Sequence, residues 1–103
     1  MQAADILLLK EAEEDLEEGR QFYDEQEAGV GDYFWDSLLA DIESLIIQAG
    51  VHQQAYGLHR MLAKHFPYAV YYQIFDGKAY VVAVLPVRRS PTWIENRLQD
   101  RRK

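Results

Sequence analysis

Residues 68–85 read YAVYYQIFDGKAYVVAVL, two runs of aromatic and β-branched residues on either side of Asp76-Gly77. Aromatic and β-branched side chains favour pleated strands. An Asp-Gly pair between two such runs favours a two-residue hairpin turn, because the turn needs positive φ angles that glycine adopts without strain. The stretch therefore predicts an antiparallel hairpin of strands 68–75 and 80–85, the second of which ends at Pro86.

The turn fixes which side chains share a face of the hairpin. With Phe75 opposite Lys78, alternate residues point to opposite sides of the sheet. One face is almost wholly apolar and is predicted to be the core: Tyr68, Val70, Tyr72, Ile74, Ala79, Val81, Ala83 and Leu85. The other face is mixed but still rich in aromatic groups: Ala69, Tyr71, Gln73, Phe75, Lys78, Tyr80, Val82 and Val84.

The chain before the hairpin predicts one short strand, two helices and a further strand. Residues 3–9 form an apolar run typical of a buried strand. Residues 10–26 and 31–49 carry apolar side chains at helical spacing, and Gly29-Val30-Gly31 separates them, which predicts an antiparallel helical hairpin. A strand is predicted at 56–65. We expect the two helices to cover the apolar face of the sheet.

After the sheet, residues 88–91 predict a loop in which Ser90 caps a short helix of about 91–98. Residues 100–103 are expected to fray. Two interpretations of the mixed sheet face remain open. Either it is uncovered and marks an interaction site, or the C-terminal helix folds over it with Trp93 and Ile94. The predicted fold is α+β, with an N-terminal strand, a helical hairpin on a small antiparallel sheet and a short C-terminal helix, in one domain of residues 1–103.

Composition narrows the class of protein. The chain of 103 residues has no cysteine, which excludes disulfides and thiolate metal sites. The apolar run at residues 6–9 is too short for a signal-peptide core or a membrane span, so we expect a cytoplasmic protein. The net charge of −6 divides into −12 for residues 1–50 and +6 for residues 51–103. The acids are expected to be mostly a solvated helix face, and the basic half is expected to meet anionic groups.

The order of these elements, together with several local strings, resembles the RelE/ParE toxin superfamily. The strings are Glu11-Ala12-Glu13-Glu14-Asp15-Leu16, Phe22-Tyr23, Gly57-Leu58-His59-Arg60, Phe66-Pro67-Tyr68-Ala69-Val70-Tyr71-Tyr72, Val82-Ala83-Val84-Leu85 and Arg88-Arg89-Ser90-Pro91. The resemblance spans nearly the whole chain. It implies the toxin of a type II toxin–antitoxin system, held inactive by a cognate antitoxin.

The superfamily offers two activities. RelE-like toxins are ribosome-dependent messenger-RNA endonucleases, whereas ParE-like toxins poison DNA gyrase. RNA cleavage needs an acid–base group and cations for the phosphorane charge. RelE-like toxins place a His or Tyr near the C-terminus, often just before the arginine pair. This chain has Pro86-Val87 there, and no His or Tyr follows Arg89. The resemblance therefore favours the ParE branch, with no catalytic residues and no cofactor.

Site residues follow from this interpretation. We expect Arg88, Arg89, Arg60 and Lys64 to contact the target. We expect the antitoxin, a ParD-like ribbon-helix-helix protein, to contact Tyr71, Phe75, Tyr80, Val82, Glu13, Glu17 and Asp24. The competing structural interpretation of the arginine pair is that one of them pairs with Asp36 or Asp41. DNA binding is expected only through the antitoxin.

Other sites and functions were weighed against these. His52, His59 and His65 lack the spacing of metal ligands and suit surface or turn positions. The sheet tyrosines suit core or interface positions first and base-stacking platforms second. Two functional alternatives to a gyrase poison remain. One is a RelE-like endonuclease using Arg60, Lys64, Arg88 and Arg89, and the other is a non-toxic homologue that acts only in an antitoxin–repressor complex.

Overall fold

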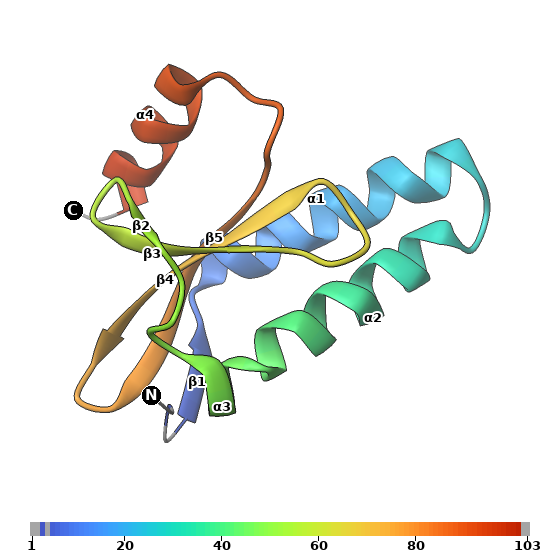
Figure 1. Cartoon of the computed structure of the whole chain (residues 1–103). Coiled ribbons are helices and arrows are strands. Elements are labelled where there is room, and N and C mark those ends of the chain that lie inside the picture. Colours follow the sequence, from blue (N-terminus) through green and yellow to red (C-terminus); the bar gives the residue numbers. More distant parts are fainter. Residues whose placement is uncertain (1–2, 4, 102–103) are drawn as a thin grey trace.

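The structure, a computed structural model, describes residue 3 and residues 5–101. Figure 1 shows a twisted sheet with a pair of long helices on one side and a shorter helix on the other. The elements in chain order are β1 (Asp5–Leu8), α1 (Lys10–Gln26), α2 (Val30–Glu43), α3 (Leu45–Gln48), β2 (Gln54–Ala55), β3 (Leu58–Leu62), β4 (Tyr68–Phe75), β5 (Lys78–Pro86) and α4 (Pro91–Arg101). The predicted α+β fold is confirmed.

The sheet has five strands in the order β1-β5-β4-β3-β2. The predicted hairpin of β4 and β5 is present, with Phe75 opposite Lys78 and positive φ angles at Asp76 and Gly77. The sheet is mixed rather than antiparallel throughout, because β1 pairs with β5 in parallel after the helical hairpin returns the chain to the sheet. A second tight turn at Tyr56 and Gly57, both with positive φ, shortens the strand predicted at 56–65 and adds the unpredicted β2.

The helices α1 and α2 form the predicted hairpin. They pack closely at Gly19, where a Cβ atom would lie 2.5 Å from the ring of Phe34. The Asp24 carboxylate holds the link between them by accepting hydrogen bonds from the N–H groups of Gly29 and Gly31, at 3.2 and 2.8 Å. The second helix does not run unbroken over 31–49 as predicted. A turn at Ser44 divides it into α2 and α3, and the Ser44 hydroxyl donates to the Asp41 carbonyl at 2.6 Å.

A β-bulge in β5 changes which residues face the helical hairpin. Tyr72 lies opposite Val81, but Tyr71 lies opposite Ala83, so Val82 is an extra residue on β5. The predicted alternation is therefore wrong beyond the bulge, since an unpaired residue shifts the pleat by one. Val84 packs in the core beneath α1 and α2, whereas Ala83 and Leu85 face the opposite side.

The opposite side of the sheet carries a second core, which α4 covers. Ile94 and Leu98 of α4 pack there with Tyr71 of β4 and with Val82, Ala83 and Leu85 of β5. Tyr71 and Val82 are 1% and 2% exposed, so the prediction that they form an open antitoxin surface is wrong. Of the two interpretations of this face, coverage by the C-terminal helix is the correct one around Tyr71 and Val82.

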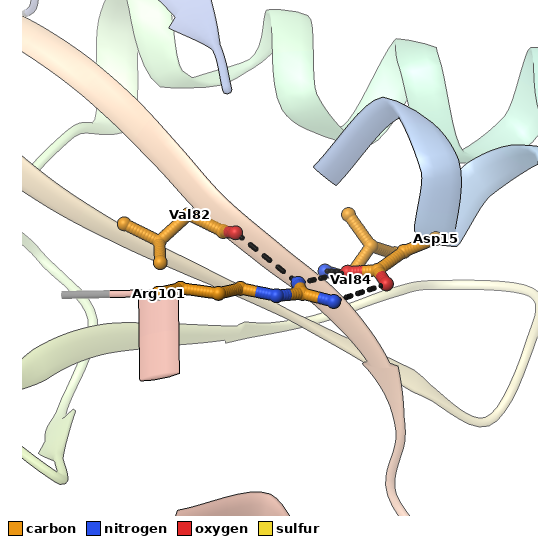
Figure 2. A network of polar contacts seen from close by, with 4 residues as sticks. All are labelled: Asp15, Val82, Val84 and Arg101. Atoms are coloured by element: carbon orange, nitrogen blue, oxygen red, sulfur yellow. Dashed lines mark hydrogen bonds and ion pairs between the residues drawn. The ribbon is translucent and has the colours of Figure 1, made fainter. Parts of the chain in front are cut away.

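A buried ion pair fastens the end of α4 to α1 (Figure 2). The Arg101 guanidinium donates hydrogen bonds to both carboxylate oxygens of Asp15, and the two side chains are 8% and 4% exposed. Beyond the end of β1, the backbone of β5 joins the same network: the Val84 N–H donates to Asp15 at 2.9 Å, and the Val82 carbonyl accepts from Arg101 at 3.3 Å. The expectation that residues 100 and 101 fray is therefore wrong, while residues 102 and 103 lie outside the described residues.

Candidate functional site

A groove of about 360 Å³ runs between α1, the end of β5 with its following loop, and α4. It is lined by Asp15, Glu18, Gly19, Gln21, Phe22, Glu25, Tyr68, Val84, Leu85, Pro86, Arg88, Arg89, Trp93 and Arg97. The two predicted target residues Arg88 and Arg89 thus lie in one groove, together with Arg97, which the sequence had not indicated. A concave surface with a few convergent polar groups is the usual form of a binding site.

The basic wall of the groove is held in place by aromatic rings. The Arg88 guanidinium lies over the Phe22 ring at 5.8 Å, and those of Arg89 and Arg97 lie over the Trp93 ring at 4.6 and 4.5 Å. A ring attracts a cation through the negative charge of its π face. Within the part of the chain that the structure describes, none of these three side chains forms an ion pair or a hydrogen bond. The proposed pairing of an arginine with Asp36 or Asp41 is therefore wrong for the described residues.

A second wall belongs to α1 and is acidic, although Arg88 reaches the Phe22 ring of this helix. Glu18 and Glu25 line it and are exposed, with Gln21 between them in the sequence. Asp15 also lines the groove, but Arg101 neutralises its charge. Among the described residues, the groove therefore presents cations and carboxylates that form no ion pair with the rest of the chain.

Tyr68 lines the groove between these walls and is itself buried. Burial and the neighbouring Tyr23 raise the pKa of Tyr68 to about 12, and the positive charge of Arg88 offsets part of this rise. The Tyr68 phenol is therefore protonated at neutral pH. It serves the groove as a neutral hydrogen-bonding group rather than as a general base.

The other two predicted target residues lie elsewhere. Arg60 of β3 donates from Nε to the Tyr71 hydroxyl at 3.2 Å, on the side of the sheet that α4 covers. Lys64 lines a separate pocket beside α2, and its backbone N–H donates to the Asp41 carboxylate at 3.0 Å. The four basic residues predicted to act together therefore do not form one site.

Two of the residues predicted to contact the antitoxin, Phe75 and Tyr80, lie at the hairpin end of β4 and β5 and are not covered by α4. Phe75 is 69% exposed and Tyr80 is half-buried, with ring centroids 6.5 Å apart. Leu7 of β1 is exposed and lies beside Tyr80 in the sheet register. We call Leu7, Phe75 and Tyr80 the hairpin patch.

The three predicted contact acids of α1 differ in their surroundings. Glu13 and Glu17 are exposed, and Glu17 lies 3.9 Å from Arg20 one turn further along the helix. Asp24 is occupied by the link between α1 and α2, where it accepts two backbone hydrogen bonds. Glu13 and Glu17 are thus exposed to a basic partner, although Glu17 is already paired with Arg20, whereas Asp24 has a structural role.

The histidines lie away from the groove. His52 Nδ1 is 2.6 Å from the Tyr72 hydroxyl oxygen, the His59 ring stacks on Tyr72, and His65 lies near Tyr33. Burial, and then the neighbouring His59, lower the pKa of His52. Across residues 3 and 5–101, no group of three or more His, Cys, Asp or Glu side chains is placed to hold a metal ion.

Sequence reasoning missed the α4 contribution to the groove. Trp93 and Arg97 stand four residues apart, which places them on one face of a helix. That spacing was a usable signal. Asp15 and Arg101 had no such signal, because 86 residues separate them along the chain. No helix in the described part of the chain is long and apolar enough to cross a membrane.

No protein-family model matches this chain, and neither does any curated protein. Among solved structures, it is similar to a chain of the chromosomal ParDE TA system from P. aeruginosa, with a TM-score of 0.74. The similarity covers 82% of this chain and 96% of that chain, at 10% sequence identity. At this identity the likeness shows a shared fold. It agrees with the fold expected from the RelE/ParE resemblance.

Proposed function

We propose that this protein is a ParE-like toxin that is neutralised by a cognate antitoxin and acts by binding its target in the cytoplasm. The observation that carries the proposal is the groove between α1 and α4. It gathers three arginines without ion pairs, in the described chain, on a fold shared with a ParDE system. Arginines held at a rigid concave surface are the kind of residue that dominates protein interfaces.

DNA gyrase is the target that we favour. The groove lacks a histidine, and its buried tyrosine holds its proton at neutral pH, so the carboxylates of Glu18 and Glu25 are the bases that the groove offers to the 2′-hydroxyl of RNA. The acidic α1 wall also repels a polyanion. The lack of a histidine and this repulsion favour action by binding to a protein over cleavage of messenger RNA.

We place the antitoxin on the hairpin patch and on the exposed acids Glu13 and Glu17. An amphipathic helix or strand would bury the apolar side chains of the patch. Basic residues of the antitoxin would meet the two acids at the rim, where such pairs govern the choice of partner more than affinity. A short neighbouring gene for a ribbon-helix-helix protein with an amphipathic tail would supply this partner.

The test is controlled expression of the chain in bacteria, with and without the neighbouring antitoxin gene. A gyrase poison should stop growth, cause filamentation and induce the DNA-damage response while translation continues, and the antitoxin should restore growth. Purified protein should then inhibit supercoiling by purified gyrase. Prompt cleavage of messenger RNA on purified ribosomes would instead establish the RelE-like activity. If cells grow normally at high levels of folded protein, the remaining interpretation is a non-toxic homologue that acts only in an antitoxin–repressor complex.

A further inference from the structure

We infer that the groove between α1 and α4 binds a protein segment in which an acidic and a basic side chain flank an apolar one. The inference deepens the proposed function, on which it rests, by naming the chemistry of the target segment. It follows from the opposite charges of the two walls, from the apolar side chains that also line the groove, and from the size of the groove.

The basic wall is preorganised for a carboxylate. Arg89 and Arg97 both lie over the Trp93 ring, and Arg88 lies over Phe22. A guanidinium carries its N–H donors in the plane of the group, in a fork that matches a carboxylate. Packing against a ring orients that fork without using its donors. In residues 3 and 5–101 no acid of this chain has taken them.

The acidic wall disfavours binding of a nucleic acid strand in the groove. Glu18 and Glu25 line the groove from α1, whereas Arg89 and Arg97 line it at Trp93 of α4, and Arg88 reaches Phe22 of α1. The two glutamates stand on a helix, α1, that carries eight acidic residues and two basic ones over Lys10–Gln26. A phosphodiester chain that approached the arginines would run along this negative surface. A segment that places a basic side chain there instead gains a favourable contact on both walls.

Apolar side chains also line the groove. Phe22, Pro86 and Trp93 are at least partly exposed there, whereas Val84 and Leu85 are almost wholly buried. Phe22 is 41% exposed, so an apolar side chain of a partner would remove both itself and this ring from water. A volume of about 360 Å³ is at the small end for ligand pockets, which suits a few side chains of an extended segment.

The test is selection from a phage-displayed library of random heptapeptides on the full chain, prepared by cell-free synthesis. Peptides that bind should be enriched in an acid and a base on either side of an apolar residue. Binding should report on the groove through Trp93. The chain has two tryptophans, so Trp35→Phe leaves Trp93 as the sole tryptophan, and selected peptides should change its emission when tryptophan is excited selectively.

Charge exchange makes the test specific. Arg97→Glu should weaken binding of the selected peptides at least tenfold. The double variant Arg97→Glu with Glu25→Lys should select peptides with the reverse order of charges. Arg20→Glu is the control, because Arg20 also lies over a tryptophan, Trp35 at 5.6 Å, but does not line the groove; it also breaks the ion pair of Arg20 with Asp32. This control should bind the original peptides normally, and thermal melting should verify that every variant is folded.

Three results would overturn the inference: selected peptides without acidic residues, equal binding to wild type and Arg97→Glu, or a single-stranded RNA oligonucleotide that binds more tightly and displaces the peptides. These are separate from failure of the proposed function. If the protein arrests growth and inhibits gyrase but selects no peptides of this charge pattern, only the inference about the groove is wrong. Peptide binding by a protein that leaves growth unaffected would sink the toxin proposal.

Discussion

The carboxylate of Asp15 and the guanidinium of Arg101 form a two-pronged ion pair across 86 residues of sequence, with both side chains almost wholly buried. The pair joins α1 to the last residue of α4 and also satisfies two backbone groups of β5. Burial lowers the pKa of Arg101, but the hydrogen bonds and charge of Asp15 outweigh this and raise it overall. Arg101 therefore stays charged, and its contacts with Asp15 hold α4, with its share of the groove, against the sheet.

Breaking this pair should be costly. Asp15→Ala leaves a buried guanidinium unpaired, and Arg101→Met leaves a buried carboxylate unpaired. Each should lower the free energy of unfolding by about 3–5 kcal/mol, whereas the double variant Asp15→Leu with Arg101→Met should recover much of the loss. Urea denaturation measures all three. Glu14→Ala, an exposed acid of the same helix, should change stability by less than about 0.5 kcal/mol. Single variants as stable as this control would contradict the prediction.

The arginine pair should affect toxicity without affecting the fold. Arg88→Ala and Arg89→Ala each remove an exposed cation–π contact, which is worth about 0.5–1 kcal/mol. We expect growth arrest to weaken in each variant and to disappear in the double variant, while melting temperature and antitoxin binding stay near wild type. Arg20→Ala is the control, because it loses a similar contact outside the groove and should remain fully toxic. If toxicity falls only as much as the melting temperature falls, Arg88 and Arg89 stabilise the fold and do not contact the target.

The hairpin patch should serve the antitoxin and not the target. Phe75→Ser replaces a ring that is 69% exposed, so stability and toxicity should change little. Antitoxin affinity should fall at least tenfold, because the partner loses a large apolar contact. Calorimetric titration with the purified antitoxin gives the affinity. Ile47→Ser is matched in exposure, at 67%, but lies at α3 and should bind normally. If the antitoxin binds the Phe75→Ser and Ile47→Ser variants with equal affinity, the hairpin patch is not its binding site.

The His52 cluster predicts a loss of stability in mild acid. The Gly50 N–H donates to the Tyr72 oxygen at 2.9 Å, so the Tyr72 O–H is free to donate to neutral His52. Because the pKa of His52 is lowered in the folded chain, the unfolded chain takes up a proton first as pH falls through about 6.5. Stability present above that pH is then lost progressively towards the folded pKa.

Urea midpoints at pH 7.5 and 5.5 measure this effect. Wild type should lose more stability over the interval than His52→Gln, which cannot take up the proton. His65→Gln, an exposed position beside Tyr33, should behave like wild type. An identical pH response in wild type and His52→Gln would show that other groups govern the acid sensitivity.

The features predicted best from the sequence were those that depend on residues close together along the chain. The Asp76-Gly77 turn and α1 follow from local patterns, and both were placed correctly. Pairings between distant segments were harder. The parallel pairing of β1 with β5 leaves no local mark, since β1 reads as an apolar run whichever neighbour it has.

The candidate site was predicted in part, for the same reason. Arg88 and Arg89 were found as adjacent cations in a loop, and the structure places both in the groove. Arg60 and Lys64 were grouped with them by charge alone, although one bonds to Tyr71 and the other faces α2. Coverage of Tyr71 by α4 depended on an anchor, Arg101, whose partner lies in the first helix.

The bulge at Val82 has a consequence for sequence comparison. Before the bulge the odd-numbered residues Ala79 and Val81 face the helical hairpin, whereas after it the even-numbered Val84 does, so the positions of β5 that face this core are out of step by one. An alignment of relatives that holds β5 to a continuous alternation would match inward residues with outward ones over half the strand. Placing a single gap at Val82 in relatives with a straight strand should restore agreement, and the gap itself would mark the relatives that lack the bulge.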